Sequence, residues 1–302
     1  MSGLLGGKVA IVTGSGQGLG GAYAEALAAA GASVVINDVN ADTANDTVAA
    51  IRSVGGTAVS VIAPVGPTET ADVLVATALR EFGRLDIMVT NAGVLRDKVL
   101  WKMSDDDFDL VIQTHLRGTF TCGRAAAVAM REQGEGGRLI LIGSPAGQHG
   151  NFGQTNYAAA KAGIVAFART WSMELARAGI TVNAVIPTAL TAMTATIPIY
   201  KDVVAAYQAG EPLPKQVRQV HALGGPEDVA PLIVWLASDG SSTVTGQAIG
   251  IGGDKLSLYS HSSEIALEYR DGGWDPQAIG AAWPGSFAAH EQSSGITLPP
   301  LE

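Results

Sequence analysis

The chain has 302 residues, of which 47% are hydrophobic and 16% charged, and a formal net charge of −9. This length suits one α/β domain of about 250 residues plus a tail. The acidic balance, with no clustered Lys and Arg, argues against a nucleic-acid partner. No apolar run reaches about eighteen residues, the start of the chain lacks the regions of a signal peptide, and Cys122 is the one cysteine. We therefore expect a cytoplasmic protein without a membrane span. We expect no metal site, because no group of acidic or thiol side chains has the spacing of metal ligands.

The amino-terminal segment predicts a dinucleotide site. An apolar run at residues 8–13 precedes a glycine-rich turn, Gly14 to Gly20, and an alanine-rich segment that ends at Gly31. This order predicts a strand, a turn whose backbone can approach a pyrophosphate, and a helix whose N-terminus favours the negative charge. Asp38 follows the next predicted strand, and its carboxylate can accept hydrogen bonds from the adenosine ribose but would repel a 2′-phosphate. We therefore expect NAD rather than NADP, with Asp38 as a helix N-cap or turn residue as the alternative.

Strands and helices continue to alternate along the chain. Further strands are predicted at residues 57–62, 86–90, 139–143, 180–186 and 246–251. Repeated alternation predicts one doubly wound, Rossmann-like parallel sheet, here of seven strands. Polar or small-residue motifs follow several of these strands, and the carboxyl ends of such strands are where these sheets bind ligands.

The stretch from Ser144 to Lys161 predicts proton-transfer chemistry. It places a hydroxyl after an apolar strand and then, in an alanine-rich helix, Tyr157 and Lys161 four residues apart on one face. A phenol of pKa near 10 is a poor base at neutral pH. An ammonium about 4 Å away contributes roughly 4 kcal/mol at an effective dielectric of 20, enough to lower that pKa by about three units. Taken alone, the same pattern also fits an ordinary surface helix.

The last third of the chain carries two less regular segments. Residues 188–221 have mixed polarity and prolines at 198, 212 and 214, which predicts a substrate flap with a short helix or two. Residues 254–302 hold Trp274 and Trp283 and form a C-terminal extension that we expect to pack on the body or on a partner subunit, the alternative being a loosely ordered terminus. The predicted catalytic domain spans residues 1–253.

These motifs in order resemble the short-chain dehydrogenase/reductase family over residues 6–253. They are Thr-Gly-x3-Gly-x-Gly, Asn91-Ala-Gly, a Ser thirteen residues before Tyr157-x3-Lys161, and Pro187 after the sixth strand. Residues 91–97, 115–118 and 150–154 and the long tail are most similar to the 3-hydroxyacyl-CoA dehydrogenase domain of the peroxisomal type 2 multifunctional enzyme, and bacterial relatives that oxidise acyl-CoA side chains, including those of steroids, are also similar.

The resemblance implies a role for each matching position. Tyr157 is the expected acid/base, Lys161 holds the nicotinamide ribose and lowers the phenol pKa, and Ser144 hydrogen-bonds the substrate oxygen. The cofactor residues it implies, besides Tyr157 and Lys161, are Gly14, Gly18, Leu19, Gly20, Asp38, Asn91, Ala92, Gly93, Pro187, Ala189 and Thr191. We further expect four residues between Ser144 and Tyr157 to touch substrate, namely Gln148, His149, Asn151 and Phe152.

Three positions depart from the family pattern. His115 stands where most members carry an Asn that helps to hold a relay water, and it either takes part in catalysis or positions its helix. Pro64 replaces an Asp that contacts the adenine amino group, and Thr188 replaces the Gly that usually follows Pro187.

The predicted function is that of an NAD-dependent dehydrogenase acting on a secondary alcohol, the β-hydroxyl of an acyl-CoA thioester. The alternatives are a 3-oxoacyl-carrier-protein reductase, usually specific for NADPH, a dehydrogenase of free steroids or alcohols, and a non-catalytic NAD-binding regulator. The resemblance also implies a homodimer or homotetramer, because relatives associate through helices that include the one carrying Tyr157.

Overall fold

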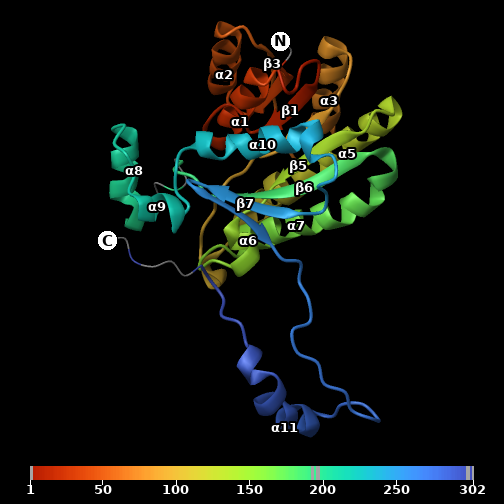
Figure 1. Ribbon diagram of the computed structural model, residues 1–302, viewed down its shortest axis with the longest axis vertical. Coiled ribbons are helices and arrows are strands. Elements are labelled where there is room, and N and C mark those ends of the chain that lie inside the picture. The colour runs from red at the N-terminus through yellow and green to blue at the C-terminus, as the bar shows by residue number, and fades with distance from the viewer. Residues whose placement is uncertain (1–2, 192–193, 195–197, 297–299, 301–302) are drawn as a thin grey trace.

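The computed structural model describes residues 3–191, 194, 198–296 and 300 (Figure 1). Its centre is an eight-stranded sheet of order β3-β2-β1-β4-β5-β6-β7-β8. The strands are β1 Val9–Thr13, β2 Ser33–Asp38, β3 Thr57–Ile62, β4 Ile87–Thr90, β5 Gly137–Ile142, β6 Ile180–Pro187, β7 Ala248–Gly252 and β8 Lys255–Tyr259. The order reverses between β1 and β4, and that switch point is where such sheets bind ligands.

The doubly wound fold with its seven parallel strands is confirmed, and the sheet has an eighth strand that the sequence analysis did not predict. Strands β1 to β7 are parallel, and β8 returns antiparallel beside β7, pairing Lys255 with Gly252. Only Gly253 and Asp254 connect them, and Gly253 has a positive φ of 50°, which suits a tight hairpin turn. The eighth strand therefore lies within the segment expected to be an extension outside the sheet.

Helices cover both faces of the sheet. The helices of the described residues are α1 Gly18–Ala29, α2 Ala41–Ser53, α3 Thr68–Phe82, α4 Asp105–Ile112, α5 Gly118–Gln133, α6 Pro145–His149, α7 Thr155–Glu174, α8 Lys201–Gln208, α9 Lys215–Gln219, α10 Ala230–Ala237 and α11 Pro276–Ser286, of which α1, α2, α3, α5, α7 and α10 pack on the sheet. One core joins α1, α2 and α10 to one face, and a second core joins α3, α5 and α7 to the other. Alternate residues of β1 enter the two cores, Ala10 the first and Ile11 the second. A strand buried on both faces reads as a continuous apolar run.

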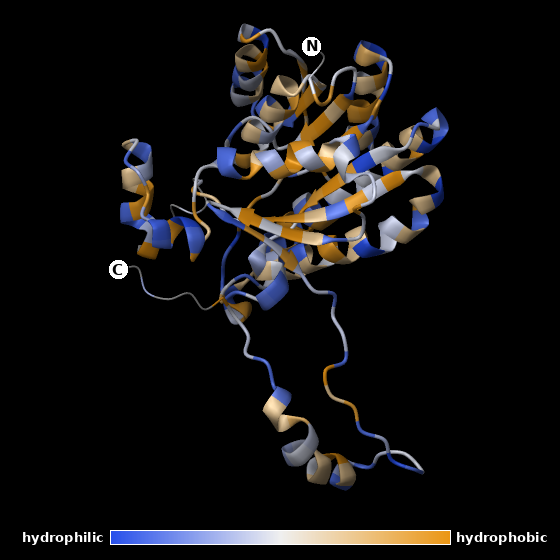
Figure 2. Cartoon of the chain, in the orientation of Figure 1, coloured by the Kyte–Doolittle hydropathy of each residue, from blue (hydrophilic) through white to orange (hydrophobic). Residues whose placement is uncertain are grey.

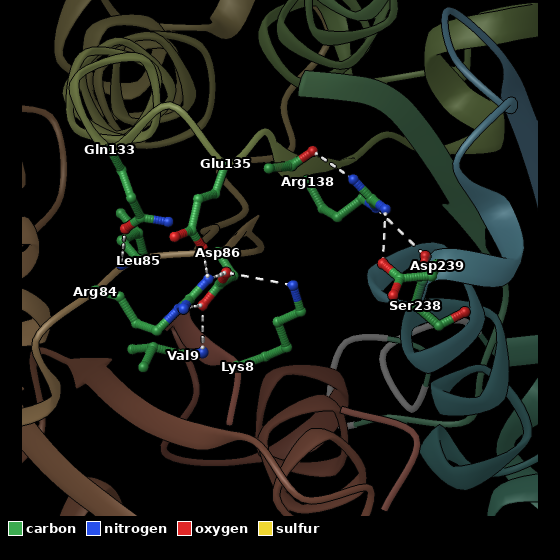
Figure 3. A network of polar contacts seen from close by, with 11 residues as sticks. Lys8, Val9, Arg84, Leu85, Asp86, Gln133, Glu135, Arg138, Ser238 and Asp239 are labelled. Carbon is green, nitrogen blue, oxygen red and sulfur yellow. Dashed lines mark hydrogen bonds and ion pairs between the residues drawn. The ribbon is translucent and has the colours of Figure 1, made fainter. Parts of the chain in front are cut away.

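A network of charges fixes the amino ends of the strands, away from the carboxyl ends (Figure 3). The buried carboxylate of Asp86 accepts hydrogen bonds from the Val9 backbone N–H at 2.9 Å and from two nitrogens of Arg84 at 2.8 and 2.7 Å. Arg84 also pairs with Glu135 at 2.6 Å, and Lys8 lies 3.6 Å from Asp86. The network ties the start of β1 to the residue that precedes β4.

The segment after β6 folds into helices α8 and α9, which share a small core of their own with Leu190 and Leu223. The Leu190 N–H donates to the Gly224 carbonyl at 2.7 Å, so the two ends of this segment meet. Part of the predicted flap, residues 192–193 and 195–197, lies outside the described residues. Helix α11 of the tail buries none of its residues.

The described residues contain neither a membrane-spanning helix nor a cluster of metal ligands. None of the helices there is both long and apolar enough to cross a membrane. No group of three or more His, Cys, Asp and Glu side chains in that part of the chain could hold a metal ion.

Candidate active site

Ser144, Tyr157 and Lys161 meet beyond the carboxyl end of β5. Ser144 caps α6, its hydroxyl accepting from the Ala146 N–H at 3.2 Å, while Tyr157 and Lys161 lie in the first two turns of α7. The Tyr157 phenol hydrogen-bonds Ser144. The ammonium of Lys161 donates to the Ile142 carbonyl at 2.6 Å and lies 5.6 Å from the centre of the Tyr157 ring. All three side chains are at most 9% exposed, which gives a compact group shielded from bulk water.

Burial dominates the acid/base properties of this group. The pKa of Tyr157 is raised above 10, first because burial disfavours the phenolate and also because Asp97 is near, while the hydrogen bond from Ser144 lowers it. Burial lowers the pKa of Lys161 to about 7. In this structure desolvation outweighs the hydrogen bond that lowers the phenol pKa, and the lowering expected from Lys161 stays a prediction. A phenol in this state is a proton donor at neutral pH.

His115 lies in a π-helical turn, Gln113–Arg117, that joins α4 to α5. Its ring is 2% exposed and packs edge-to-face on Tyr157, with ring centres 5.1 Å apart. Its Nε2 lies 3.0 Å from the Val94 N–H and 2.8 Å from the Val94 carbonyl, so each tautomer makes one of the two bonds. Burial, helped by the charge of Lys161, lowers its pKa to about 3, and the imidazole is therefore neutral at neutral pH. This contact pattern suits a residue that positions its neighbours.

A cradle for a dinucleotide lies between β1, α1 and β4. Gly14 and Gly18 have positive φ values of 60° and 58°, and no atom lies within 4 Å of where a side chain at Gly18 would begin. Gly20 approaches the Gly14 carbonyl so closely that a Cβ there would lie 2.1 Å away. The Asn91 amide donates to the carbonyls of Thr13 and Gly14 at 3.1 and 2.9 Å and so holds the turn in place. This open, N–H-rich turn at the start of α1 fits a pyrophosphate.

Asp38 lies at the end of β2 next to this turn. One carboxylate oxygen accepts from the Gly16 N–H at 3.0 Å, and the other accepts from the Asn40 N–H at 3.1 Å. The carboxylate is therefore held in one orientation at the edge of the cradle, the place where an adenosine ribose is expected. The N-cap of the following helix is Asn40, so Asp38 is not the helix N-cap.

The remaining predicted residues are placed less centrally. Pro187 ends β6, Ala189 is buried and Thr191 is partly buried. Gln148 and His149 end α6, and the ring of His149 faces Tyr259 with centres 6.1 Å apart. In the turn before α7, Asn151 bonds Gln154 at 3.0 Å and Phe152 is 86% exposed. The structure thus places the four substrate candidates on the segment between Ser144 and Tyr157.

Comparison with known proteins assigns the family. The family model described as Enoyl-(Acyl carrier protein) reductase matches residues 14–253. A solved short-chain dehydrogenase from Mycobacterium avium superposes with a TM-score of 0.82 at 34% identity, over 99% of both chains. The chain belongs to the short-chain dehydrogenase/reductase family. It is therefore an oxidoreductase of a fold that binds a nicotinamide dinucleotide and acts on a small molecule.

Two of the curated relatives in this family differ in the acyl carrier that their names give. A hydroxyacyl-CoA dehydrogenase of Mycobacterium tuberculosis is 40% identical over 97% of this chain and 93% of its own. A 3-oxoacyl-[acyl-carrier-protein] reductase of Synechocystis is 41% identical over 82% of this chain and 96% of its own. The peroxisomal multifunctional enzyme type 2 of mouse is 40% identical over 77% of this chain, which corresponds to 30% of that longer protein.

Three residues that support the site escaped the sequence analysis. The hydroxyl of Thr13 accepts from the N–H groups of Asn91 and Ala92 at 3.0 and 3.1 Å. Asn156 is fully buried and donates to the carbonyls of Arg96 and Asp107. Its side-chain oxygen accepts from the Tyr157 N–H at 2.8 Å. Asp97 acts on the phenol through its charge. An Asn directly before Tyr157, in the first turn of an apolar helix, is the one signal that could have revealed such a support.

Proposed function

We propose that this short-chain dehydrogenase/reductase oxidises the β-hydroxyl of a 3-hydroxyacyl-CoA to a ketone with NAD, and catalyses the reverse reduction. The observation that carries the proposal is the buried group of Ser144, Tyr157 and Lys161 beside a cradle that fits a dinucleotide. The named activity of the M. tuberculosis relative, which matches almost the whole chain, supports the acyl-CoA substrate.

Each residue of the buried group has a distinct task. Bound NAD supplies the hydride acceptor. The Ser144 hydroxyl bonds the substrate oxygen and orients it toward the phenol. As phenolate, the Tyr157 oxygen takes the hydroxyl proton during oxidation, and as phenol it gives its proton to the carbonyl oxygen during reduction. Lys161 holds the nicotinamide ribose from the buried side of α7, and His115 keeps the Tyr157 ring and Val94 in place.

The proposed cofactor contacts follow the cradle. Gly14, Gly18, Leu19 and Gly20 contact the pyrophosphate, and Asn91, Ala92 and Gly93 lie at the nicotinamide ribose. Pro187, Ala189 and Thr191 flank the nicotinamide amide, and the segment from Gln148 to Phe152 faces the acyl group. Asp38 supports NAD over NADP because its fixed carboxylate would repel a 2′-phosphate.

The decisive test is a comparison of Tyr157→Phe with the wild-type protein. Loss of the hydroxyl removes the proton-transfer group but keeps the ring, so we expect turnover of a 3-hydroxyacyl-CoA to fall by about 10²–10⁴-fold, the usual contribution of a general acid/base. NADH binding, followed by fluorescence, stays within a factor of a few. Near wild-type turnover in this variant would refute the mechanism.

A 3-oxoacyl-carrier-protein reductase is the second candidate, because the Synechocystis relative carries that name. Steady-state assays with NAD and NADP, each against a hydroxyacyl-CoA, its carrier-protein thioester and a free secondary alcohol, separate the readings. The proposal requires the highest kcat/KM for NAD with the CoA thioester. The Asp38→Ser variant then gains activity with NADP, while the matched Asp42→Ser variant, on the surface of α2, does not.

We also infer that the protein self-associates through α4, α5 and α7. Phe120, Val128 and Met173 are 37%, 50% and 73% exposed on this face. The continuous helix from α4 to α5 begins with three exposed acids, Asp105, Asp106 and Asp109, and carries exposed arginines from its middle to its end, at Arg117, Arg124 and Arg131, with Glu132 as an exposed acid beside the last of them. A two-fold axis across this helix sets acidic halves against basic halves. Light scattering tests the inference, since Val128→Asp should lower the molar mass.

A further inference from the structure

The segment after β6 carries two helices, α8 and α9, that stand beside the sheet as a small body (Figure 1). Both helices mix hydrophilic with hydrophobic residues (Figure 2), and the hydrophobic ones form a core with Leu190 and Leu223. Leu190 precedes both helices and Leu223 follows them, so this core closes the segment into one unit. We call this unit the flap, and residues 188–190 and 222–224 its two roots.

The two roots of the flap meet on the turn that follows β7. The Leu190 N–H donates to the Gly224 carbonyl at 2.7 Å, which joins one root to the other. A Cβ at Gly252, the last residue of β7, would overlap with the carbonyl oxygens of both Thr188 and Ala222. Backbone therefore packs directly on backbone at this point, and no flexible side chain lies between to absorb a displacement.

Ala222 marks the second root as a constrained point. Among the described residues it is the one non-glycine residue with a positive φ, 54°. A residue with a Cβ avoids this left-handed region unless the surrounding structure holds it there. The preceding residue, His221, is 3% exposed, and its Nδ1 lies 3.3 Å from the hydroxyl of Tyr200, the N-cap of α8. The root is thus held from the side of the flap as well as from the sheet.

A clamp of three charged residues, Arg218, Asp228 and Asp254, ties the flap to the body. The Nε of Arg218, in α9, donates to Asp254 at 2.7 Å, and its two terminal nitrogens donate to the two oxygens of Asp228 at 3.2 and 3.0 Å. The Asp254 N–H donates in return to the Arg218 carbonyl at 3.0 Å. Asp254 belongs to the turn between β7 and β8, and Asp228 lies just before α10. The planar fork of one guanidinium therefore joins α9 to two separate parts of the body.

Asp228 is also tied to the second root. One of its oxygens accepts from the Gly225 N–H at 2.9 Å, directly after that root. Its neighbour Glu227 accepts from the hydroxyl of Tyr207, in α8, at 3.1 and 3.0 Å. The side chains of Arg218 and Asp228 are 30% and 22% exposed, so their pair is partly shielded from water. Loss of the guanidinium leaves two carboxylates beside the flap backbone without their counter-charge.

We propose that Arg218 is a positioning residue for the dehydrogenase reaction: it holds the flap on the turn after β7 and thereby fixes residues 188–191 where the nicotinamide amide is expected. This role rests on the proposed function, in which Pro187, Ala189 and Thr191 flank that amide. A displacement of α9 passes through the packed roots to the residues that follow β6. A misplacement of about 1 Å in a reacting geometry can lower turnover about 10²-fold, even when its origin is far from the chemistry.

The experiment compares Arg218→Gln with a matched control elsewhere in the full-length protein. The Arg84 side chain is equally exposed, 31% against 30%, and also pairs with two carboxylates, those of Asp86 and Glu135. That network lies at the amino ends of the strands (Figure 3), so Arg84→Gln removes a comparable set of contacts away from the flap. Arg218→Lys, which keeps the charge but not the fork, is the conservative variant.

Hydrogen exchange in the cofactor-free proteins measures the first root directly. The Thr188 N–H donates to the Ile251 carbonyl at 2.9 Å, and the Leu190 N–H bonds the second root. We expect both amides to exchange at least tenfold faster in Arg218→Gln than in the wild-type protein, and no such change in Arg84→Gln. Thermal unfolding of both variants separates this local effect from a general loss of stability. Unchanged exchange at both amides in Arg218→Gln overturns the proposal.

Kinetics with NAD and a 3-hydroxyacyl-CoA give the second measurement. We expect kcat to fall about 10- to 100-fold in Arg218→Gln and to recover in part in Arg218→Lys, while Arg84→Gln keeps the wild-type kcat even where its Tm falls as far. Wild-type kcat in Arg218→Gln, or the same loss in both glutamine variants, overturns the proposal.

Two further outcomes keep the comparison decisive. If Arg218→Gln does not fold, Asp254→Asn removes one arm of the clamp and keeps its backbone hydrogen bond, and the same changes are expected in the same direction. A wild-type protein that does not oxidise the hydroxyacyl-CoA contradicts the proposed function. The exchange of the Thr188 and Leu190 amides then still decides whether Arg218 holds the flap, since it needs no substrate.

Discussion

The contact between Gly93 and His115 offers a quantitative test of how the site is held together. A Cβ at Gly93 would lie 2.2 Å from Cε1 of His115, well inside van der Waals distance. Gly93 does not have a positive φ, so an alanine is compatible with the backbone and the effect comes from packing alone. Overpacking a rigid core costs about 1–3 kcal/mol. We expect Gly93→Ala to lower the free energy of unfolding by that amount and to displace the imidazole from Tyr157.

A double-mutant cycle isolates the contact. His115→Ala alone leaves a void and removes the partner of the Val94 backbone, at a cost of about 1–3 kcal/mol. In that background the methyl group introduced by Gly93→Ala no longer meets the imidazole. This second substitution should therefore lower the free energy of unfolding only slightly, and the coupling energy should be about 1 kcal/mol or more. Urea unfolding of the four proteins measures this coupling energy. Dehydrogenase kinetics show whether the displaced imidazole also moves the Tyr157 phenol. Additivity within about 0.5 kcal/mol would show that the two residues do not constrain each other.

Two further predictions concern tyrosines. Because burial raises the pKa of Tyr157, its phenolate in the cofactor-free protein should appear only at a higher pH than that of an exposed tyrosine. Alcohol oxidation, which needs the phenolate, should rise with pH where ketone reduction does not. A difference spectrum of wild type against Tyr157→Phe that shows tyrosinate at neutral pH would contradict this. Tyr23 is fully buried with no partner for its hydroxyl, so Tyr23→Phe should leave the free energy of unfolding unchanged or raise it by about 1–2 kcal/mol; a loss of stability in urea unfolding would reveal a bond, to protein or water, at that hydroxyl.

Much of the site could be predicted because it lies where strands end. The glycine turn, Asp38, Asn91 and Ser144 each follow an apolar run directly, and parallel strands bring such ends to one edge. Tyr157 and Lys161 needed only the helical spacing of four to share a face. These inferences depend only on the order and spacing of residues along the chain, and they need no information about packing.

Burial could not be predicted in the same way. The charge of Lys161 is visible in the sequence, but the desolvation of Tyr157 depends on Val111, Ala146 and Val94, which reach it from three different segments. The sign of the pKa shift therefore depended on contacts between distant parts of the chain. The same is true of His115, whose role follows from the close approach of Gly93 and not from its position in a motif.

Pro64 lies beside a polar contact that holds the ends of β2 and β3 together. The Asn37 amide, buried at the end of β2, donates to the carbonyls of Val61 and Ala63 at 3.1 and 2.9 Å. It thus ties the end of β2 to the end of β3 from the adjacent strand, beside a proline that has no N–H to offer. The family pattern compares position 64 alone, and it therefore does not reveal that Asn37 holds this end of the sheet together.

Strand β8 was missed for a related reason. Residues 255–259, Lys-Leu-Ser-Leu-Tyr, alternate with the period of a strand, and Gly253-Asp254 before them suits a two-residue turn. The resemblance to the family ended at residue 253, and the expected sheet ended with it, although the physical pattern continued. Because Leu256 and Leu258 remain exposed, their alternation within one chain buries little. The strand therefore forms through its backbone pairing with β7, from Ala248–Tyr259 to Gly252–Lys255, and not through burial of its leucines.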